Sequence, residues 1–291
     1  MKHIIKTALV FIFASTSIFS LSEWDEKLLE GIDNSDYKQV VSSVQNGADV
    51  NVKDGEFSAL LVAIKDARDE DGFRIVEYLI SKGADVNENS NSWQFSPLVL
   101  SVQKQRKRVF DLLIQNKKVD INLKNRQGFT ALFLAVQIPD DSYYTRELIR
   151  AGAKVNLTAK TVTPLYVACS SGNYESVHSL VKAGANINVV ATVNKSSTPL
   201  MRAVMSGNSK IVKLLLEKGA DRNAQTTDGE TALSIAEKSG HDDIAQLLKG
   251  AEKEAEPEKK KKSKNDKKKS KKKKKDKKNK KNKKKNQINL K

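Results

Sequence analysis

Apolar residues recur three and four positions apart along most of the chain, in pairs of short segments. The segment Leu165–Ser170 predicts a short first helix, and the apolar positions within Ile211–Leu216 predict a second helix with one buried face. Glycine-containing turns such as Gly172-Asn173 and Gly207-Asn208 separate the two helices of a pair. The pattern therefore predicts an all-α fold built from consecutive helix pairs.

A five-residue phrase that ends in Asn occurs six times. Its Asn-to-Asn steps are 36, 35, 34, 32 and 35 residues, so one structural unit is repeated along the chain. The copies are Gly47–Asn51, Gly83–Asn87, Lys118–Asn122, Gly152–Asn156, Gly184–Asn188 and Gly219–Asn223. The glycine is typical of the residue that ends a helix in the left-handed region, and the Asn is expected to close the following loop with side-chain hydrogen bonds.

A second phrase begins each first helix with a hydroxyl residue followed by Pro or Ala and then Leu. Its copies start at Ser58, Ser96, Thr130, Thr163, Thr198 and Thr231. The hydroxyl is a helix N-cap, because it can accept a hydrogen bond from a free backbone amide, and Pro or Ala suits the first helical position.

These two phrases, recurring in phase, resemble the ankyrin repeat. The resemblance covers residues 23–250 and implies a solenoid of about seven helix-turn-helix units joined by hairpin loops, at roughly 33 residues a unit. We expect helices around Trp24–Ile32 and Tyr37–Gln45 to form an N-terminal cap, and the unit that ends at Leu247–Gly250 to form the C-terminal cap.

The chain departs from the family pattern in four ways. The family usually has His after Thr-Pro-Leu, and we expect apolar packing to replace its polar contacts here, where the position holds Leu61, Val99, Phe133, Tyr166, Met201 and Ser234. Residues Asp66–Gly72 are inserted, Lys118 replaces the helix-ending glycine, and Pro139–Asp141 lies between two helices. The middle of the array is therefore predicted to be uneven.

The resemblance implies a concave face built from hairpin tips and first helices, where a partner protein binds. Residues just before the N-caps are hairpin positions to which we assign no structural duty: Phe57, Phe95, Phe129, Val162, Ser197 and Glu230. Aromatic side chains in a row favour an interface, so the candidate partner-binding residues are Phe57, Trp93, Phe95, Phe129, Val162 and Tyr166. The alternative is that the phenylalanines pack internally between hairpins.

The positive charge of the chain belongs to its C-terminal segment. The whole sequence has a net charge of +17, and residues 251–291 hold 22 Lys against six Asp and Glu. This segment lacks aromatic residues and is predicted to be disordered. The candidate polyanion-binding residues are Lys259, Lys260, Lys261, Lys262, Lys271, Lys272, Lys273, Lys274 and Lys275. Their partner would be anionic lipid, an acidic wall polymer or nucleic acid bound without sequence preference, and the alternative is a solubilising tail with no partner.

Residues 1–22 have the pattern of a secretory signal. Lys2 and Lys6 precede the apolar run Ala8–Ala14, and the small residues Ser20 and Ser22 predict cleavage after Ser22. We therefore expect an exported protein, periplasmic or secreted, with an uncleaved N-terminal membrane anchor as the alternative.

The residues that enzymes use are scarce. Cys169 is the single cysteine, and we expect it to be a small buried residue. His178 and His241 are the histidines after residue 22, and they form no metal or catalytic motif. The sequence predicts a non-enzymatic, monomeric interaction scaffold without a cofactor. Two alternatives remain open: a polyanion-binding protein that acts through its tail, and a secreted effector delivered to a host cell.

Overall fold

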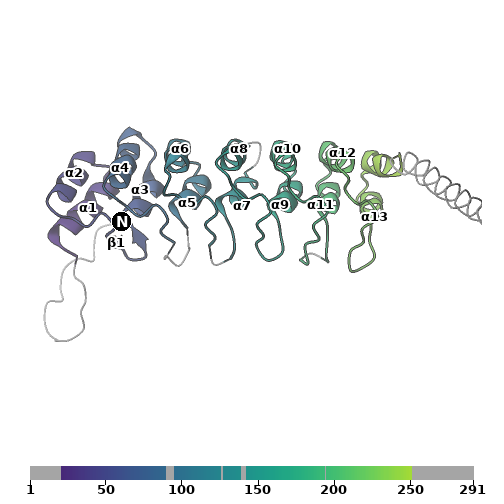
Figure 1. Ribbon diagram of the computed structural model, residues 1–291, viewed down its shortest axis with the longest axis horizontal. Helices are drawn as coiled ribbons and strands as arrows, with labels where there is room; N and C mark the ends of the chain where they lie inside the picture. Colours follow the sequence, from purple (N-terminus) through teal and green to yellow (C-terminus); the bar gives the residue numbers. More distant parts are fainter. Residues whose placement is uncertain (1–20, 90–94, 126, 139–141, 194, 251–291) are drawn as a thin grey trace, which may run out of the picture.

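A computed structural model describes residues 21–89, 95–125, 127–138, 142–193 and 195–250. Two rows of antiparallel helices run side by side along one axis (Figure 1). The inner row is α1 (Glu23–Asp33), α3 (Ala59–Asp66), α5 (Pro97–Gln103), α7 (Ala131–Ala135), α9 (Pro164–Ser170), α11 (Pro199–Met205) and α13 (Ala232–Lys238). The outer row is α2 (Tyr37–Gln45), α4 (Glu70–Ser81), α6 (Lys107–Gln115), α8 (Tyr143–Arg150), α10 (Tyr174–Lys182), α12 (Ser209–Glu217) and the helical residues 242–250.

The described residues therefore form seven helix pairs, and the predicted solenoid is confirmed. Hairpin loops extend from the inner row on the side away from the outer helices (Figure 1). One hairpin contains the two-stranded sheet of β1 (Lys53–Asp54) and β2 (Phe57–Ser58). Within the part of the chain that the structure describes, no helix has the length and apolar character needed to cross a membrane.

Each inner helix from α3 onward begins at the hydroxyl residue that the sequence identified. In α9, Thr163 has extended backbone angles and its side chain accepts a hydrogen bond from the backbone N–H of Tyr166 at 3.2 Å. The same contact is made by Ser58, Ser96, Thr130, Thr198 and Thr231. The N-cap prediction is therefore confirmed in all six units.

The outer helices end in two ways. After α10 the chain turns at Gly184, whose φ of +85° favours glycine. The unit that has Lys118 in place of this glycine ends its helix earlier: α6 stops at Gln115, and Asn116 takes an extended conformation. The Asn116 side chain then accepts a hydrogen bond from the Lys118 backbone N–H at 2.9 Å, so the turn forms without a positive φ at Lys118.

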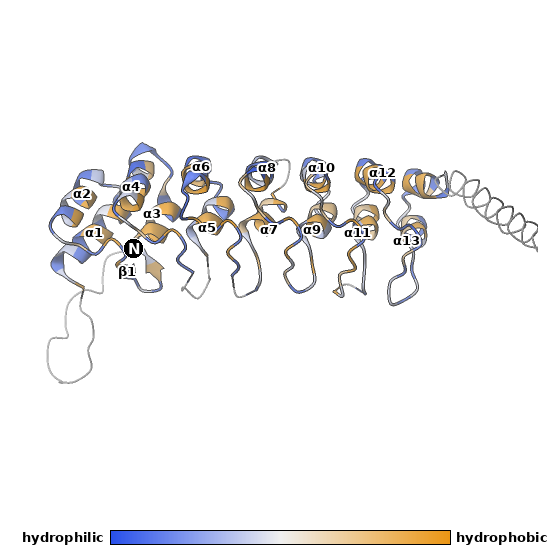
Figure 2. Ribbon diagram, viewed as in Figure 1, coloured by the Kyte–Doolittle hydropathy of each residue, from blue (hydrophilic) through white to orange (hydrophobic). Residues whose placement is uncertain are grey.

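One apolar core runs the length of the array, between the two rows of helices. Figure 2 shows the apolar faces of both rows turned toward each other. One leucine in each outer helix from α4 to α12 is fully buried: Leu79, Leu113, Leu148, Leu180 and Leu215. Since each pair buries this face against its neighbours, the core is continuous but never closes on itself.

Polar contacts persist where apolar replacement was expected. The Tyr166 hydroxyl lies 2.7 Å from the Ser197 hydroxyl in the next unit, and both side chains are buried. The expectation of purely apolar packing is therefore wrong at this position, because the tyrosine ring is long enough to bring its hydroxyl to the neighbouring hairpin. A second buried pair joins the outer helices α8 and α10, where Thr145 and Ser176 lie 3.1 Å apart through their hydroxyls.

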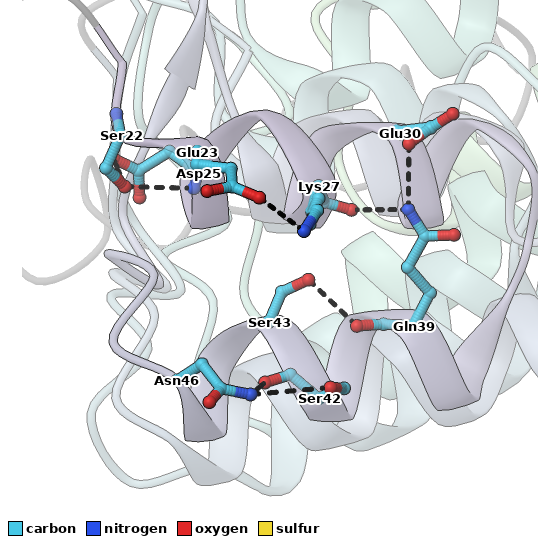
Figure 3. Close-up of polar contacts among 9 residues, drawn as sticks. All are labelled: Ser22, Glu23, Asp25, Lys27, Glu30, Gln39, Ser42, Ser43 and Asn46. Carbon is cyan, nitrogen blue, oxygen red and sulfur yellow. Dashed lines mark hydrogen bonds and ion pairs between the residues drawn. The ribbon is translucent and has the colours of Figure 1, made fainter.

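The first helix pair is held by local side-chain bonds (Figure 3). Ser22 caps α1: its hydroxyl accepts from the Asp25 backbone N–H at 3.1 Å and donates to the Asp25 carboxylate at 2.7 Å. Gln39 of α2 donates to the Lys27 carbonyl and to the Glu30 carboxylate, both at 3.0 Å. These bonds fix α2 against α1 at the end of the array, as expected of an N-terminal cap.

Candidate partner-binding surface

The hairpin tips form a connected row along one side of the solenoid. The Lys124 ammonium donates to the Thr158 carbonyl of the next tip at 3.3 Å. The hydroxyls of Thr161 and Thr192 lie 3.0 Å apart, and the Thr192 backbone N–H donates to Thr161 at 3.1 Å. The Thr227 backbone N–H donates to the Lys195 carbonyl at 2.9 Å. Contacts between tips therefore join four successive units.

A second line of bonds passes through the asparagines of the repeated phrase. Each Asn side-chain carbonyl accepts a hydrogen bond from a backbone N–H in the following unit, at 2.7–2.9 Å. The residues are Asn51, Asn87, Asn122, Asn156 and Asn188. We call this set the asparagine ladder. The expectation that these asparagines close their own loop is wrong, because their side chains bond the following unit and fix its position. The loop itself is closed by residues such as Asp49 and Asp85, whose carboxylates accept from the backbone N–H groups of Asn51 and Asn87 at 2.9 Å and 2.8 Å.

Two tips have a backbone conformation that disfavours their residues. Lys160 and Thr161 have φ values of +48° and +71°, and they connect the bridged residues Ala159 and Val162. Lys195 and Ser196 have φ values of +63° and +60°. Positive φ at non-glycine residues is uncommon, and tight hairpins of this kind usually contain Asn-Gly. These tips therefore keep charged and hydroxyl side chains at some cost in backbone energy.

Replacing Ser196 by Gly should stabilise the protein. Glycine enters the left-handed region without the clash of a Cβ atom, so we expect Ser196→Gly to raise the free energy of unfolding by roughly 0.5–1 kcal/mol. Urea unfolding followed by circular dichroism measures the change. Ser206→Gly is the matched control, because Ser206 has a φ of −77° and should gain nothing. Equal gains in both variants would contradict the strain.

The residues that precede the N-caps have structural contacts, so the assumption that they lack a structural duty is wrong. Phe57 belongs to β2, and both Phe57 and Phe95 are half-buried against the core. Phe129 stacks on Phe133 with ring centroids 4.8 Å apart. Ser197 is buried beside Tyr166, and Glu230 pairs with the Lys238 ammonium at 2.5 Å. These positions contribute to packing because the hairpin lies against an inner helix, that of its own unit for Phe129 and that of the preceding unit for Ser197.

The six candidate partner-binding residues therefore lie in different environments. Phe57, Phe95, Phe129 and Val162 are half-buried, and each retains a partly accessible side chain. Tyr166 is 3 % exposed and belongs to the packing between units, which leaves little of its ring to contact a partner. Trp93 lies outside the described residues. The structure thus brings no continuous aromatic row to the surface among the described candidates.

The charged residues of the tips escaped the sequence interpretation, which looked for aromatic side chains. Lys124, Lys160 and Lys195 are exposed on consecutive tips. Lys195 pairs with Asp228 at 2.5 Å, and this contact raises the pKa of the lysine above its ordinary value. Lys160 forms no ion pair with any residue that the structure describes. The signal that could have found this row is the lack of acidic residues in the segments that contain it.

The groups that could support catalysis are buried or solitary. Burial raises the pKa of the Cys169 thiol well above its ordinary range, which favours the unreactive protonated form. His178 is exposed and stacks on Tyr174, and it forms no ion pair with any residue that the structure describes. The described residues contain no group of three His, Cys, Asp or Glu that could hold a metal ion.

The inserted segment of the second unit is used for helix contacts. The Asp69 side chain caps α4 by accepting from the Gly72 backbone N–H at 2.8 Å. Glu70 pairs with Arg108 of α6 at 2.5 Å, so the insertion also links two outer helices. Hydrogen bonding to this guanidinium lowers the pKa of the Glu70 carboxyl. The outer helices meet again where the Tyr143 hydroxyl donates to Asp111, which raises the tyrosine pKa to about 12.

Known proteins share this repeat. The human transient receptor potential cation channel subfamily A member 1 is 30% identical over 226 residues, which is 73% of this chain and 19% of the channel. Human Rabankyrin-5 is 28% identical over 217 residues, 63% of this chain and 18% of its own length. Alpha-latrocrustotoxin-Lt1a of Latrodectus tredecimguttatus is 31% identical over 121 residues, 41% of this chain and 8% of the toxin. The chain therefore spans less than a fifth of each of these relatives.

The sequence profile of the family described as ankyrin repeats (3 copies) matches residues 30–125, 117–191 and 190–261. Together these matches cover most of the chain and agree with the seven helix pairs, the N-cap residues and the asparagine ladder. Ankyrin repeats act as scaffolds for protein–protein interaction, so partners of this kind are implied. The chain belongs to the ankyrin-repeat family.

Proposed function

We propose that this protein is an exported, non-enzymatic scaffold that binds a partner protein through its hairpin tips and the inner helices beside them. The observation that supports this most directly is the bonded row of tips, which gives a long surface of fixed shape. A surface that is already ordered loses little conformational entropy when a partner binds. Among the exposed side chains of the tips, Lys160 forms no ion pair with any residue that the structure describes, so its ammonium group remains available.

The inner helices provide the rest of the proposed face. Met205, at the end of α11, is 52 % exposed, and Val190 on the preceding hairpin is 50 % exposed. The Arg202 guanidinium reaches back to the Ser170 hydroxyl at 2.7 Å and lies 5.5 Å from the centre of the Tyr166 ring. Such a mixture of apolar and polar groups on a concave face is typical of a non-obligate interface.

Affinity capture from envelope extract with the full chain tests this proposal. We expect one protein partner to be retained, and Met205→Ala together with Val190→Ala to weaken its capture. His178→Ala on the outer row is the matched control and should leave capture unchanged. If the outer-row variant loses the partner while the tip and inner-helix variant keeps it, the proposed face is wrong.

The alternative of a polyanion-binding protein rests on the charge of residues 251–291. Replacing the nine lysines named above by Gln in the full chain separates the two functions. A scaffold retains its partner at both low and high salt in this variant, whereas a polyanion binder loses most of its affinity because phosphate and headgroup contacts depend on Lys. The third possibility, a secreted effector, shares the scaffold mechanism and differs in destination.

Export leads to a prediction at Ser22. Cleavage after Ser22 would remove the residue that caps α1, so Ser22→Ala should lower the stability of the uncleaved chain by about 1 kcal/mol and leave the cleaved protein unchanged. Mass spectrometry of the exported protein identifies its first residue, which we expect to be Glu23, and thermal unfolding of both forms measures the cap. An exported chain that retains Ser22 would contradict the cleavage position.

A further inference from the structure

Charge is distributed unequally between the two ends of the solenoid. Residues 21–72 contain 13 Asp and Glu against five Lys and Arg, and residues 73–250 contain 16 Asp and Glu against 23 Lys and Arg. The net charge of the repeats is therefore close to zero only because an acidic N-terminal end and a basic remainder cancel each other. Surfaces of opposite sign at two ends of a long molecule orient a charged partner before contact.

The basic remainder contains stretches with no negative charge at all. The segments 121–138, 151–174 and 183–216 contain neither Asp nor Glu. They supply three successive hairpins and the inner helices α7, α9 and α11. Their positively charged residues are Lys124, Arg126, Lys154, Lys160, Lys195, Arg202, Lys210 and Lys213. Arg126 lies outside the described residues; of the others, all but the last two lie in a hairpin loop or an inner helix, the elements that form the proposed binding face.

The tip contacts place these charges side by side. Lys124 touches the backbone of Thr158, two residues before Lys160, and Thr161 is bonded to the hairpin that contains Lys195. Asp228 neutralises Lys195 at the C-terminal end of the row. The ammonium groups of Lys124 and Lys160 have no carboxylate partner among the described residues. Exposed Thr158, Thr161 and Thr192 add hydroxyl groups that can donate to an anion.

We propose that the tips and inner helices of residues 121–206, which we call the basic face, bind an acidic, extended protein segment of the partner. This inference rests on the proposed function and adds the chemistry of the partner. The carboxylates of such a segment would meet Lys124 and Lys160, while the acidic end of the solenoid repels it from residues 21–72. The strained tips at Lys160-Thr161 and Lys195-Ser196 agree with side chains retained for binding.

Lysine acetylation of the full chain tests the basic face residue by residue, so the lysines of residues 251–291 do not obscure the result. The probe is a 16-residue polyglutamate peptide, and mass spectrometry gives the acetylation rate of each lysine with and without it. We expect Lys124 and Lys160 to react roughly fivefold more slowly with the probe present. Lys182 and Lys218, exposed on the outer row, are internal controls and should be unaffected.

A charge-reversal pair tests whether the position of the charge matters. We expect the probe to protect Lys154, which is exposed within the basic face, as well. Lys124→Glu with Lys160→Glu should abolish this protection, whereas Lys182→Glu with Lys218→Glu changes the net charge equally and should preserve it. Equal protection of tip and outer lysines would overturn the proposal. Stronger protection by a single-stranded oligonucleotide of the same charge would also overturn it, in favour of nucleic acid. The capture experiment tests whether the face binds a partner protein, and the polyglutamate probe tests whether that partner is acidic. The first proposal can therefore hold even if the second is wrong.

Discussion

Phe110→Ala should lower the free energy of unfolding by about 3–5 kcal/mol, the largest change that we expect from a single substitution in this chain. The Phe110 ring is fully buried between α6 and α8. It makes edge contacts with Tyr144 and Tyr143, with ring centroids 4.9 Å and 6.2 Å away. Truncation removes these contacts and leaves a cavity, because helices held on both sides by neighbouring units cannot collapse into the space.

The substitution should also divide the unfolding transition. Units of a solenoid contact only their neighbours, so weakening the joint between α6 and α8 allows the two halves of the array to unfold separately. Urea unfolding followed by circular dichroism should show an earlier and broader transition with a reduced m value. Phe57→Ala, on a half-buried hairpin residue, is the control and should cost less. Equal losses for the two variants would contradict this account of the core.

Thr145→Val should destabilise the protein by about 1–3 kcal/mol, although the two side chains have nearly the same shape. The substitution removes the hydroxyl that lies 3.1 Å from Ser176 and leaves the Ser176 hydroxyl buried without that partner. Thermal or urea unfolding measures the loss. The cost comes from an unsatisfied polar group, so it should be larger than the loss of a few van der Waals contacts would predict.

A second substitution distinguishes this cause from a packing defect. Ser176→Ala in the Thr145→Val background removes the orphaned hydroxyl, and we expect the double variant to be more stable than Thr145→Val alone. If the two losses simply add, the hydroxyl pair does not couple α8 to α10. Neither residue lies on the tips, so partner capture should be the same in all three variants.

The array itself could be predicted because its determinants are local and repeated. Thr163 and its equivalents cap helices through contacts with residues three positions away, and Gly184 ends a helix through its own backbone conformation. These features can therefore be predicted from the sequence of a single unit. The asparagines were found through their regular recurrence, although the sequence predicted that they close their own loops. Their bonds to the next unit follow from the constant spacing, which places identical residues in register along the axis.

The candidate surface was harder to predict because exposure depends on which neighbour a side chain meets. Tyr166 has the pattern of an accessible aromatic residue, yet its hydroxyl reaches Ser197 in the next unit and the ring becomes buried. Phe129, on the hairpin, lies against Phe133 of the following helix α7. Both contacts depend on how far the hairpin folds back, which a hydropathy pattern does not specify. Lys124 and Lys160 carry no periodic apolar signal, so the search for aromatic anchors passed over them.

The asparagine ladder keeps the spacing between successive units of the solenoid constant. Packed helices lie roughly 8–10 Å apart, and the ladder fixes successive units at that pitch, so successive tips present their lysines at the same interval. A polyproline II chain advances about 3.1 Å per residue and completes a turn in three residues, or roughly 9 Å. A ligand in that conformation with a carboxylate at every third position would meet one tip per turn. A β-strand would direct every second such carboxylate away from the protein, because its side chains alternate.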